Sequence, residues 1–111
     1  MKIDTNLDDI LGEFEDLLDN VDQVVSRQVA KTAYNIEREA KQRCPVDTGR
    51  LRGSITTNVK DTEAEVGSNV EYAKFVELGT SYQAAQPFLI PAFENNIDGL
   101  EDRIVGDLLD D

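Results

Sequence analysis

Apolar residues recur every three or four positions along the first 43 residues, which is the spacing of one face of an α-helix. They are Leu7, Ile10, Leu11, Phe14, Leu17, Leu18, Val21, Val24, Val25, Val29, Ala33, Ile36 and Ala40. A helix from Leu7 to Arg43 would be about 55 Å long, which exceeds what a chain of 111 residues can cover along one edge. We therefore expect this N-terminal helical region, residues 1–43, either to break near Asp19 and Asn20 or to pack partly against another chain.

The chain changes from helical to strand spacing between residues 44 and 55, which read Cys-Pro-Val-Asp-Thr-Gly-Arg-Leu-Arg-Gly-Ser-Ile. Pro45 disfavours α geometry at the residue before it, so the first helix should end there. Residues 47–49, Asp-Thr-Gly, combine side-chain acceptors with a residue that tolerates positive φ, as turns do. Two arginines alternate with a leucine at residues 50–52, and this alternation predicts that a strand begins directly after the turn.

A β-hairpin is predicted within residues 44–67. Apolar and β-branched residues at period two share one face of its first strand: Leu51, Ile55, Thr57 and Val59. Alternation resumes over residues 63–67, and Asp61-Thr62 lies between the two runs, where it predicts the turn.

The remaining residues predict a short helix, a loop with an edge strand, and a final helix. Residues 70–79 have helix-like apolar spacing, and Gly79 is a natural helix stop. Residues 80–91 should form a loop and then an edge strand or an extended connector, because Pro87 and Pro91 lack the N–H groups that a central strand needs. Apolar residues on one side of 92–109 predict a C-terminal helix, with Pro91 in its first turn.

The predicted fold class is therefore α+β, in a single domain of residues 1–111. It combines a long N-terminal helix, continuous or broken, with a small antiparallel sheet containing a hairpin, a short middle helix and a C-terminal helix.

The net charge of −12 is concentrated at the two ends of the chain. Residues 1–25 carry −7 and residues 94–111 carry −6, whereas residues 26–93 carry +1. This balance argues against a protein that scans nucleic acid, which needs clustered Lys and Arg, and against binding to an anionic membrane. The acidic ends are either solvated helix faces or surfaces that meet basic surfaces of a neighbouring copy or a partner.

Few residues in this chain could support catalysis or hold a cofactor. The chain has no histidine and one cysteine, which excludes a Ser-His-Asp or Cys-His arrangement, a zinc thiolate cluster and an internal disulfide. No GxxxxGK[ST], GxGxxG or calcium-loop pattern occurs. No run approaches the roughly 18 apolar residues that span a bilayer. We expect no enzyme activity, no catalytic or metal-binding residues, no cofactor and no membrane partner.

Three blocks of sequence follow one another in a specific order and spacing. The first is Ala40, then Cys44 to Arg52, then Ser54-Ile55. The second is Val66-Gly67, Tyr72-Ala73, Val76-Glu77 and Gly79-Thr80. The third is Gln86-Pro87-Phe88-Leu89 with Pro91-Ala92. Together the blocks, over residues 30–93, resemble the bacteriophage HK97 gp10-like family of tailed phages and prophages.

The resemblance implies a structural virion protein of the head–tail neck, a ring of identical subunits that completes the tail or joins it to the head. Its partners would be further copies of itself, a head-closure or adaptor protein on the head side, and tail-terminator or tail-tube proteins on the tail side. Genome DNA would pass through the ring without specific binding. Such a protein is made in the host cytoplasm and then resides in the virion.

The blocks also suggest which residues contact a neighbouring subunit. The hypothesised interface residues are Asp47, Thr48, Gly49, Arg50, Arg52, Glu77, Gly79, Thr80, Pro87, Phe88 and Leu89. Within this set, Arg50 and Arg52 are expected to pair with acids of an adjacent copy, among them Glu71, Glu77 or the acidic ends.

An alternative from another class is an acidic DNA mimic, an antagonist that occupies the basic groove of a host DNA-binding protein. A mimic needs its carboxylates on one continuous face at phosphate-like spacing, and it would act as a monomer or dimer absent from virions. A neck protein should instead form a ring and be present in purified particles.

Overall fold

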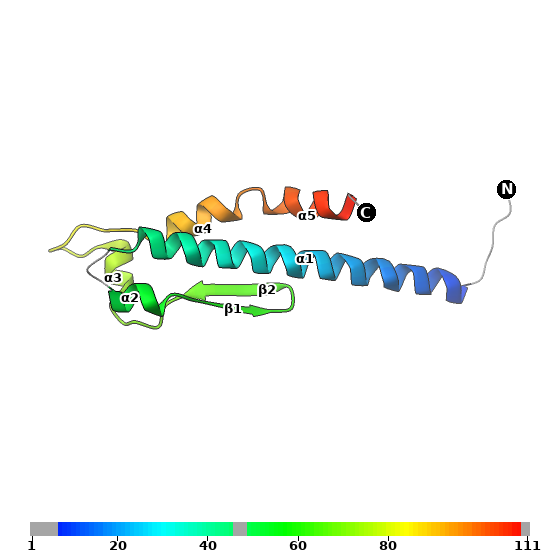
Figure 1. The fold of residues 1–111 in the computed structure, drawn as a ribbon, viewed down its shortest axis with the longest axis horizontal. Helices are drawn as coiled ribbons and strands as arrows, with labels where there is room; N and C mark the ends of the chain where they lie inside the picture. The colour runs from blue at the N-terminus through cyan, green and yellow to red at the C-terminus, as the bar shows by residue number, and fades with distance from the viewer. Residues whose placement is uncertain (1–6, 46–48, 110–111) are drawn as a thin grey trace.

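One helix, α1 (Leu7–Arg43), runs along most of the molecule, and the other elements pack along its C-terminal half (Figure 1). The computed structural model describes residues 7–45 and 49–109, which form an elongated body of 74 × 22 × 21 Å. The predicted helix is confirmed, but the alternative of a break near Asp19 and Asn20 is wrong, because α1 continues through both residues. Helical hydrogen bonding persists there because residues 7–43 contain no proline and only one glycine, Gly12.

The helix α1 ends next to Pro45, as predicted, with a last bond from the Cys44 N–H to the Ala40 carbonyl of 2.9 Å. The predicted strand at residues 50–52 is wrong, since Gly49–Ser54 form a short helix, α2. Leu51 is fully buried in it, and the Ser54 hydroxyl donates to the Leu51 carbonyl at 2.6 Å. Leu51 and Ile55 are four residues apart, a spacing that suits a helical turn as well as a strand face.

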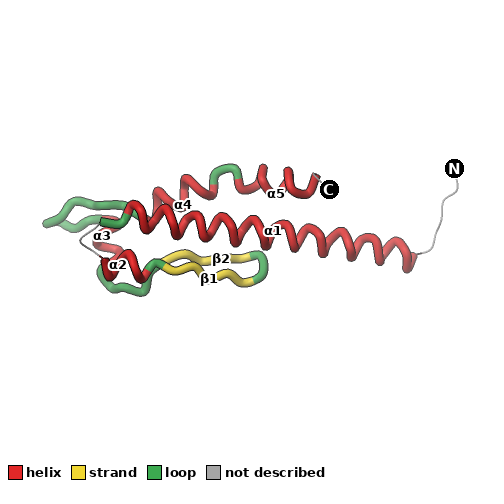
Figure 2. Tube along the Cα trace, in the orientation of Figure 1, coloured by secondary structure: helices red, strands yellow, loops and turns green. Residues whose placement is uncertain are grey.

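The β-hairpin is confirmed as β1 (Thr56–Lys60) and β2 (Glu63–Gly67), paired antiparallel (Figure 2). Thr57 lies opposite Val66 and Val59 lies opposite Ala64, so the predicted apolar face is continuous across both strands. Asp61 in the turn has φ of 54°, a left-handed conformation that Asp tolerates.

A short helix, α3 (Ala73–Leu78), follows the hairpin and ends at Gly79, as predicted. Gly79 has φ of 78°, and its N–H donates to the Phe75 carbonyl at 2.8 Å. The loop that follows returns to α3 through a bond from the Gln86 N–H to the Val76 carbonyl of 2.8 Å.

The C-terminal part contains two helices, α4 (Leu89–Ile97) and α5 (Leu100–Leu109), which lie along α1 (Figure 1). The predicted edge strand before Pro91 is wrong, because residues 89–91 already form the first turn of α4, where proline is tolerated. The predicted single helix over 92–109 is divided by a bend at Asp98 and Gly99. Asp98 ends α4 by taking an extended conformation with ψ of 130°, and Gly99 follows it with φ of 79°.

The main core lies at the α3 end of the molecule, where α1, α2, α3 and α4 meet. Its buried members are Ile36, Ala40, Cys44, Leu51, Ile55, Val70, Phe88 and Ala92. The small residues of α1 allow the short helices to pack close to it, so the C-terminal half of α1 is covered while its N-terminal half projects beyond the hairpin and α5 (Figure 2).

Candidate subunit-interaction surfaces

The three sequence blocks meet at one end of the molecule. Gly49, Arg50 and Arg52 belong to α2, and Glu77 belongs to α3, with Gly79 and Thr80 directly after it. Pro87 and Phe88 precede α4, and Leu89 begins it. Asp47 and Thr48 lie outside the described residues. The fold therefore gathers the described members of the hypothesised interface around α3.

Glu77 is a buried carboxylate, 9% exposed, that holds the start of α4. Its Oε1 accepts the N–H groups of Phe88 at 3.3 Å and Leu89 at 2.8 Å, and its Oε2 accepts that of Ile90 at 3.3 Å. These are the amide groups that a helix leaves unpaired at its N-terminus, where a negative charge is also favoured by the helix dipole. Glu77 thus has an internal role, which the sequence pattern did not reveal.

The two arginines of α2 differ in their surroundings. Arg52 is half-buried, and its Nη2 donates to the Cys44 carbonyl at 3.1 Å, which ties α2 to the end of α1. The exposed Arg50 lies over the ring of Tyr72, 5.8 Å from its centroid. Arg52 also lines a shallow basic hollow of about 410 Å³, together with Arg38, Lys41 and Gln42.

The loop after α3 is held by hydrogen bonds around Thr80. The N–H of Thr80 donates to the Gln83 carbonyl at 2.8 Å, and its Oγ1 accepts the Tyr82 N–H at 3.2 Å. Tyr82 is 98% exposed at this turn. The loop that the sequence predicts from residue 80 onward is confirmed here.

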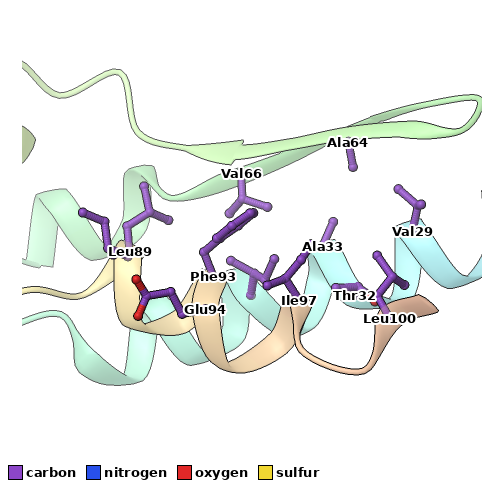
Figure 3. A pocket seen from close by; sticks show the side chains of 12 residues that line it. Val29, Thr32, Ala33, Ala64, Val66, Leu89, Phe93, Glu94, Ile97 and Leu100 are labelled. Carbon is purple, nitrogen blue, oxygen red and sulfur yellow. The ribbon is translucent and has the colours of Figure 1, made fainter. Parts of the chain in front are cut away.

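A groove of about 400 Å³ runs between α1, the hairpin and α4 (Figure 3). Its lining is almost entirely apolar: Val29, Thr32, Ala33, Ile36, Ala64, Val66, Leu89, Ile90, Phe93, Glu94, Ile97 and Leu100. Among the hypothesised interface residues that the structure describes, only Leu89 belongs to it. The other lining residues were read from the sequence as helix and strand faces, and their meeting depends on the packing of three separate elements.

Glu39 links α1 to α4 beside this groove. Its carboxylate accepts hydrogen bonds from Arg43 at 2.9 Å, from Asn95 at 3.0 Å and from Asn96 at 3.3 Å. These donors, Arg43 first, hold the pKa of Glu39 below its ordinary value. On the other side of the bend, Arg103 donates to the carbonyls of Asn96 and Asp98 and to Thr32, so it fixes α5 to both helices.

The projecting half of α1 exposes large apolar side chains. Leu11, Phe14, Leu17 and Leu18 are all about half exposed, and Phe14 reaches 57%. They continue the apolar face that the rest of α1 buries, and no described part of the chain reaches far enough to cover them (Figure 1). Such a stripe is typical of a helix that packs against another chain.

The described residues contain neither a metal-binding cluster nor a membrane-spanning helix. No group of three or more Cys, Asp or Glu side chains is placed to hold a metal ion among residues 7–45 and 49–109. Across the same ranges, no helix combines the length and apolar character needed to cross a membrane.

Comparison with known proteins adds one match. A family model, HK97-gp10_like, described as "Bacteriophage HK97-gp10, putative tail-component", matches residues 8–79. The match begins earlier than the three sequence blocks and includes most of α1, but it ends at Gly79, before the third block. No curated protein and no solved structure matches the chain. Because the matched residues make up more than half of the sequence, the chain belongs to the HK97-gp10-like family.

Proposed function

We propose that this chain is a structural virion protein of a tailed phage or prophage that forms a ring in the head–tail neck. In that position it completes the tail or joins it to the head. The observation that carries the proposal is the family match over residues 8–79, the part that contains most of α1, the hairpin and α3.

The distribution of exposed apolar residues supports a role in assembly. A 37-residue helix projects its apolar face beyond the covered part of the molecule, and an apolar groove lies open along the other half. A ring subunit must contact neighbours on both sides as well as proteins above and below, so it needs several such surfaces. We infer that the exposed members of the hypothesised interface around α2 and α3 serve one of these contacts, whereas Glu77 and Phe88 are buried and support it from inside.

The partners follow from this position. Neighbouring copies of the chain would form the ring, with a head-closure or adaptor protein on one face and a tail-terminator or tail-tube protein on the other. Genome DNA would pass through without specific contacts, consistent with the net charge of −12. The DNA-mimic alternative is less well supported, because the acidic residues of the N-terminal half of α1 are followed by the exposed cations Arg27, Lys31 and Arg38, so negative charge does not continue along the whole helix.

Deleting the gene from its phage or prophage tests the proposal. Electron micrographs of the deletion should show filled heads and separate tails, and a wild-type copy supplied in trans should restore joined particles. Proteomics of purified wild-type virions should detect the chain at a ring-like copy number. Absence of the chain from purified virions, or normal joined particles without it, would overturn the proposal.

A further inference from the structure

Two exposed apolar surfaces lie at opposite ends of this 74 Å molecule. The acidic-end surface is on the projecting half of α1 and consists of Leu11, Phe14, Leu17 and Leu18. The loop-end surface is on α3 and the following turn and consists of Phe75, Leu78 and Tyr82. Figure 1 shows α3 and this loop at one extremity and the N-terminal part of α1 at the other.

The acidic-end surface is bordered only by negative charge. Acidic residues surround it along the helix at positions 13, 15, 16, 19 and 22, and no basic residue occurs between positions 3 and 26. Two such surfaces would repel one another if they packed side by side, since like charges on facing helices destabilise the contact. A partner for this helix must therefore offer apolar area with a neutral or positive border.

The loop-end surface has these properties. Tyr82 is 98% exposed and Leu78 is 68% exposed, and hydrogen bonds around Thr80 fix the backbone of the turn that carries the tyrosine. The Lys74 ammonium lies 5.1 Å from the centre of the Phe75 ring, and Arg50 covers the nearby Tyr72. Of the two acids between residues 68 and 93, Glu77 is buried and engaged with α4, which leaves Glu71 as the exposed one.

We propose that the acidic-end surface of one copy docks on the loop-end surface of the next copy. The two surfaces cannot meet within one chain, because they lie at opposite ends of the rod. Apolar area meets apolar area, and the acids of α1 face Lys74 and Arg50. A contact between two different surfaces of identical chains is heterologous, so it propagates from copy to copy and closes into a ring when the rotation permits. The inference deepens the proposed neck ring and rests on it for the closure.

Paired variants test this contact with the full-length chain. One variant, Phe14→Ser with Leu17→Ser, removes the acidic-end surface, and a second, Leu78→Ser with Tyr82→Ser, removes the loop-end surface. All four side chains are about half exposed or more, so the folded state should survive, which circular dichroism and urea unfolding would verify. The matched control, Lys60→Ser with Glu63→Ser, changes the exposed hairpin tip.

Native mass spectrometry should show wild type and control as oligomers larger than dimers. Each variant alone should have its association weakened about tenfold or more, as expected when aromatic and leucine anchors are removed. A mixture of the two variants should stop at a dimer, because each retains the one surface that the other lacks. Wild type that stays monomeric, or a loop-end variant that still assembles alone, would overturn the proposal.

The result is separable from the proposed function. If the mixed variants form dimers but the chain is absent from virions, the proposed contact between copies stands and the proposed neck role is overturned. If the chain is present in virions but both variants assemble normally, the proposed contact is overturned and the proposed neck role stands.

Discussion

The Glu77 carboxylate accepts the backbone N–H of Leu89 at 2.8 Å, so a side chain of α3 caps a helix that begins twelve residues later. The same carboxylate also accepts the N–H groups of Phe88 and Ile90. Three backbone N–H groups at the start of α4 therefore donate to one buried carboxylate. The helix α4 in turn forms one wall of the apolar groove, which its residues Phe93 and Ile97 line (Figure 3).

Replacing Glu77 by alanine should lower the free energy of unfolding by about 1–3 kcal/mol, because three helix N-terminal amides lose their acceptor in a buried site. Glu77→Gln keeps one acceptor oxygen and should lose less. Urea unfolding followed by circular dichroism measures both changes. The control is Glu71→Ala on the exposed surface, expected within about 0.5 kcal/mol of wild type. Equal stability of Glu77→Ala and Glu71→Ala would contradict the capping role.

Gly79 should not tolerate a side chain. Its φ of 78° and ψ of 176° lie in a region open essentially only to glycine, and a Cβ there would sit 2.7 Å from the Ala85 nitrogen. Backbone strain in Gly79→Ala should therefore lower the free energy of unfolding by about 1–3 kcal/mol. The steric clash of the added Cβ should lower it further. Thermal unfolding gives the measurement.

The matched control for that substitution is Gly53→Ala in α2, where a Cβ would meet no heavy atom within 4 Å. Alanine in this helical position should stabilise the chain by about 0.4–1 kcal/mol, because it reduces the freedom of the unfolded state. If both alanine variants shifted the melting temperature in the same direction, the conformational argument for Gly79 would fail.

Acidification should weaken the link between α1 and α4 at Glu39. Because its folded-state pKa lies below the ordinary 4.5, the ionised carboxylate stabilises the fold above that value. The contribution is lost as the pH falls through the lowered pKa. The unfolding free energy of wild type should exceed that of Glu39→Gln at neutral pH, and the difference should shrink below pH 4.5. A difference that stayed constant or grew on acidification would contradict this assignment.

Periodicity alone predicted the elements whose patterns extend over many residues. The apolar spacing from Leu7 to Ala40 predicted helix throughout α1, with a break near Asp19 and Asn20 as an open alternative, and Pro45 predicted its end. The hairpin followed from the alternation around Val59 and Val66, and the α3 stop followed from Gly79. In each case the local conformational preference and the buried face point to the same structure, which is why short-range reasoning succeeded.

Two of the errors share a physical cause, namely contacts between residues distant in sequence. Residues 49–54 became a helix because Leu51 is buried against elements from elsewhere in the chain, including Phe88 and Ile36 of the same core. Residues before Pro91 became helical because Glu77 supplies their acceptor. No pattern within either segment contains that information. The length of α1 predicted either a break or a part that packs against another chain, and the exposed stripe fits the second alternative. The exposure of Tyr82 depended on a turn whose geometry the sequence did not specify.

The arginines of α2 provide the last prediction. Arg50→Glu should reduce association of copies several-fold at low salt, because it replaces a cation at the border of the loop-end surface with an anion that repels the acidic end of α1. The loss should diminish as salt increases, since exposed charges are screened over about 10 Å at 0.1 M. Analytical ultracentrifugation at two salt concentrations measures it.

Arg52→Glu should act differently, because Arg52 also donates to the Cys44 carbonyl. Arg52→Glu should lower both the stability against urea and the association of copies, whereas Arg50→Glu should lower the association alone. Asp16→Lys with Asp19→Lys, mixed with Arg50→Glu, should restore part of the binding by reversing both sides of the contact. Lys60→Glu at the hairpin tip is the matched charge reversal and should leave association unchanged. Unimpaired assembly of the double variant Arg50→Glu and Arg52→Glu would rule out pairing of these arginines with a neighbouring copy, because no cation of α2 would remain to face its acids.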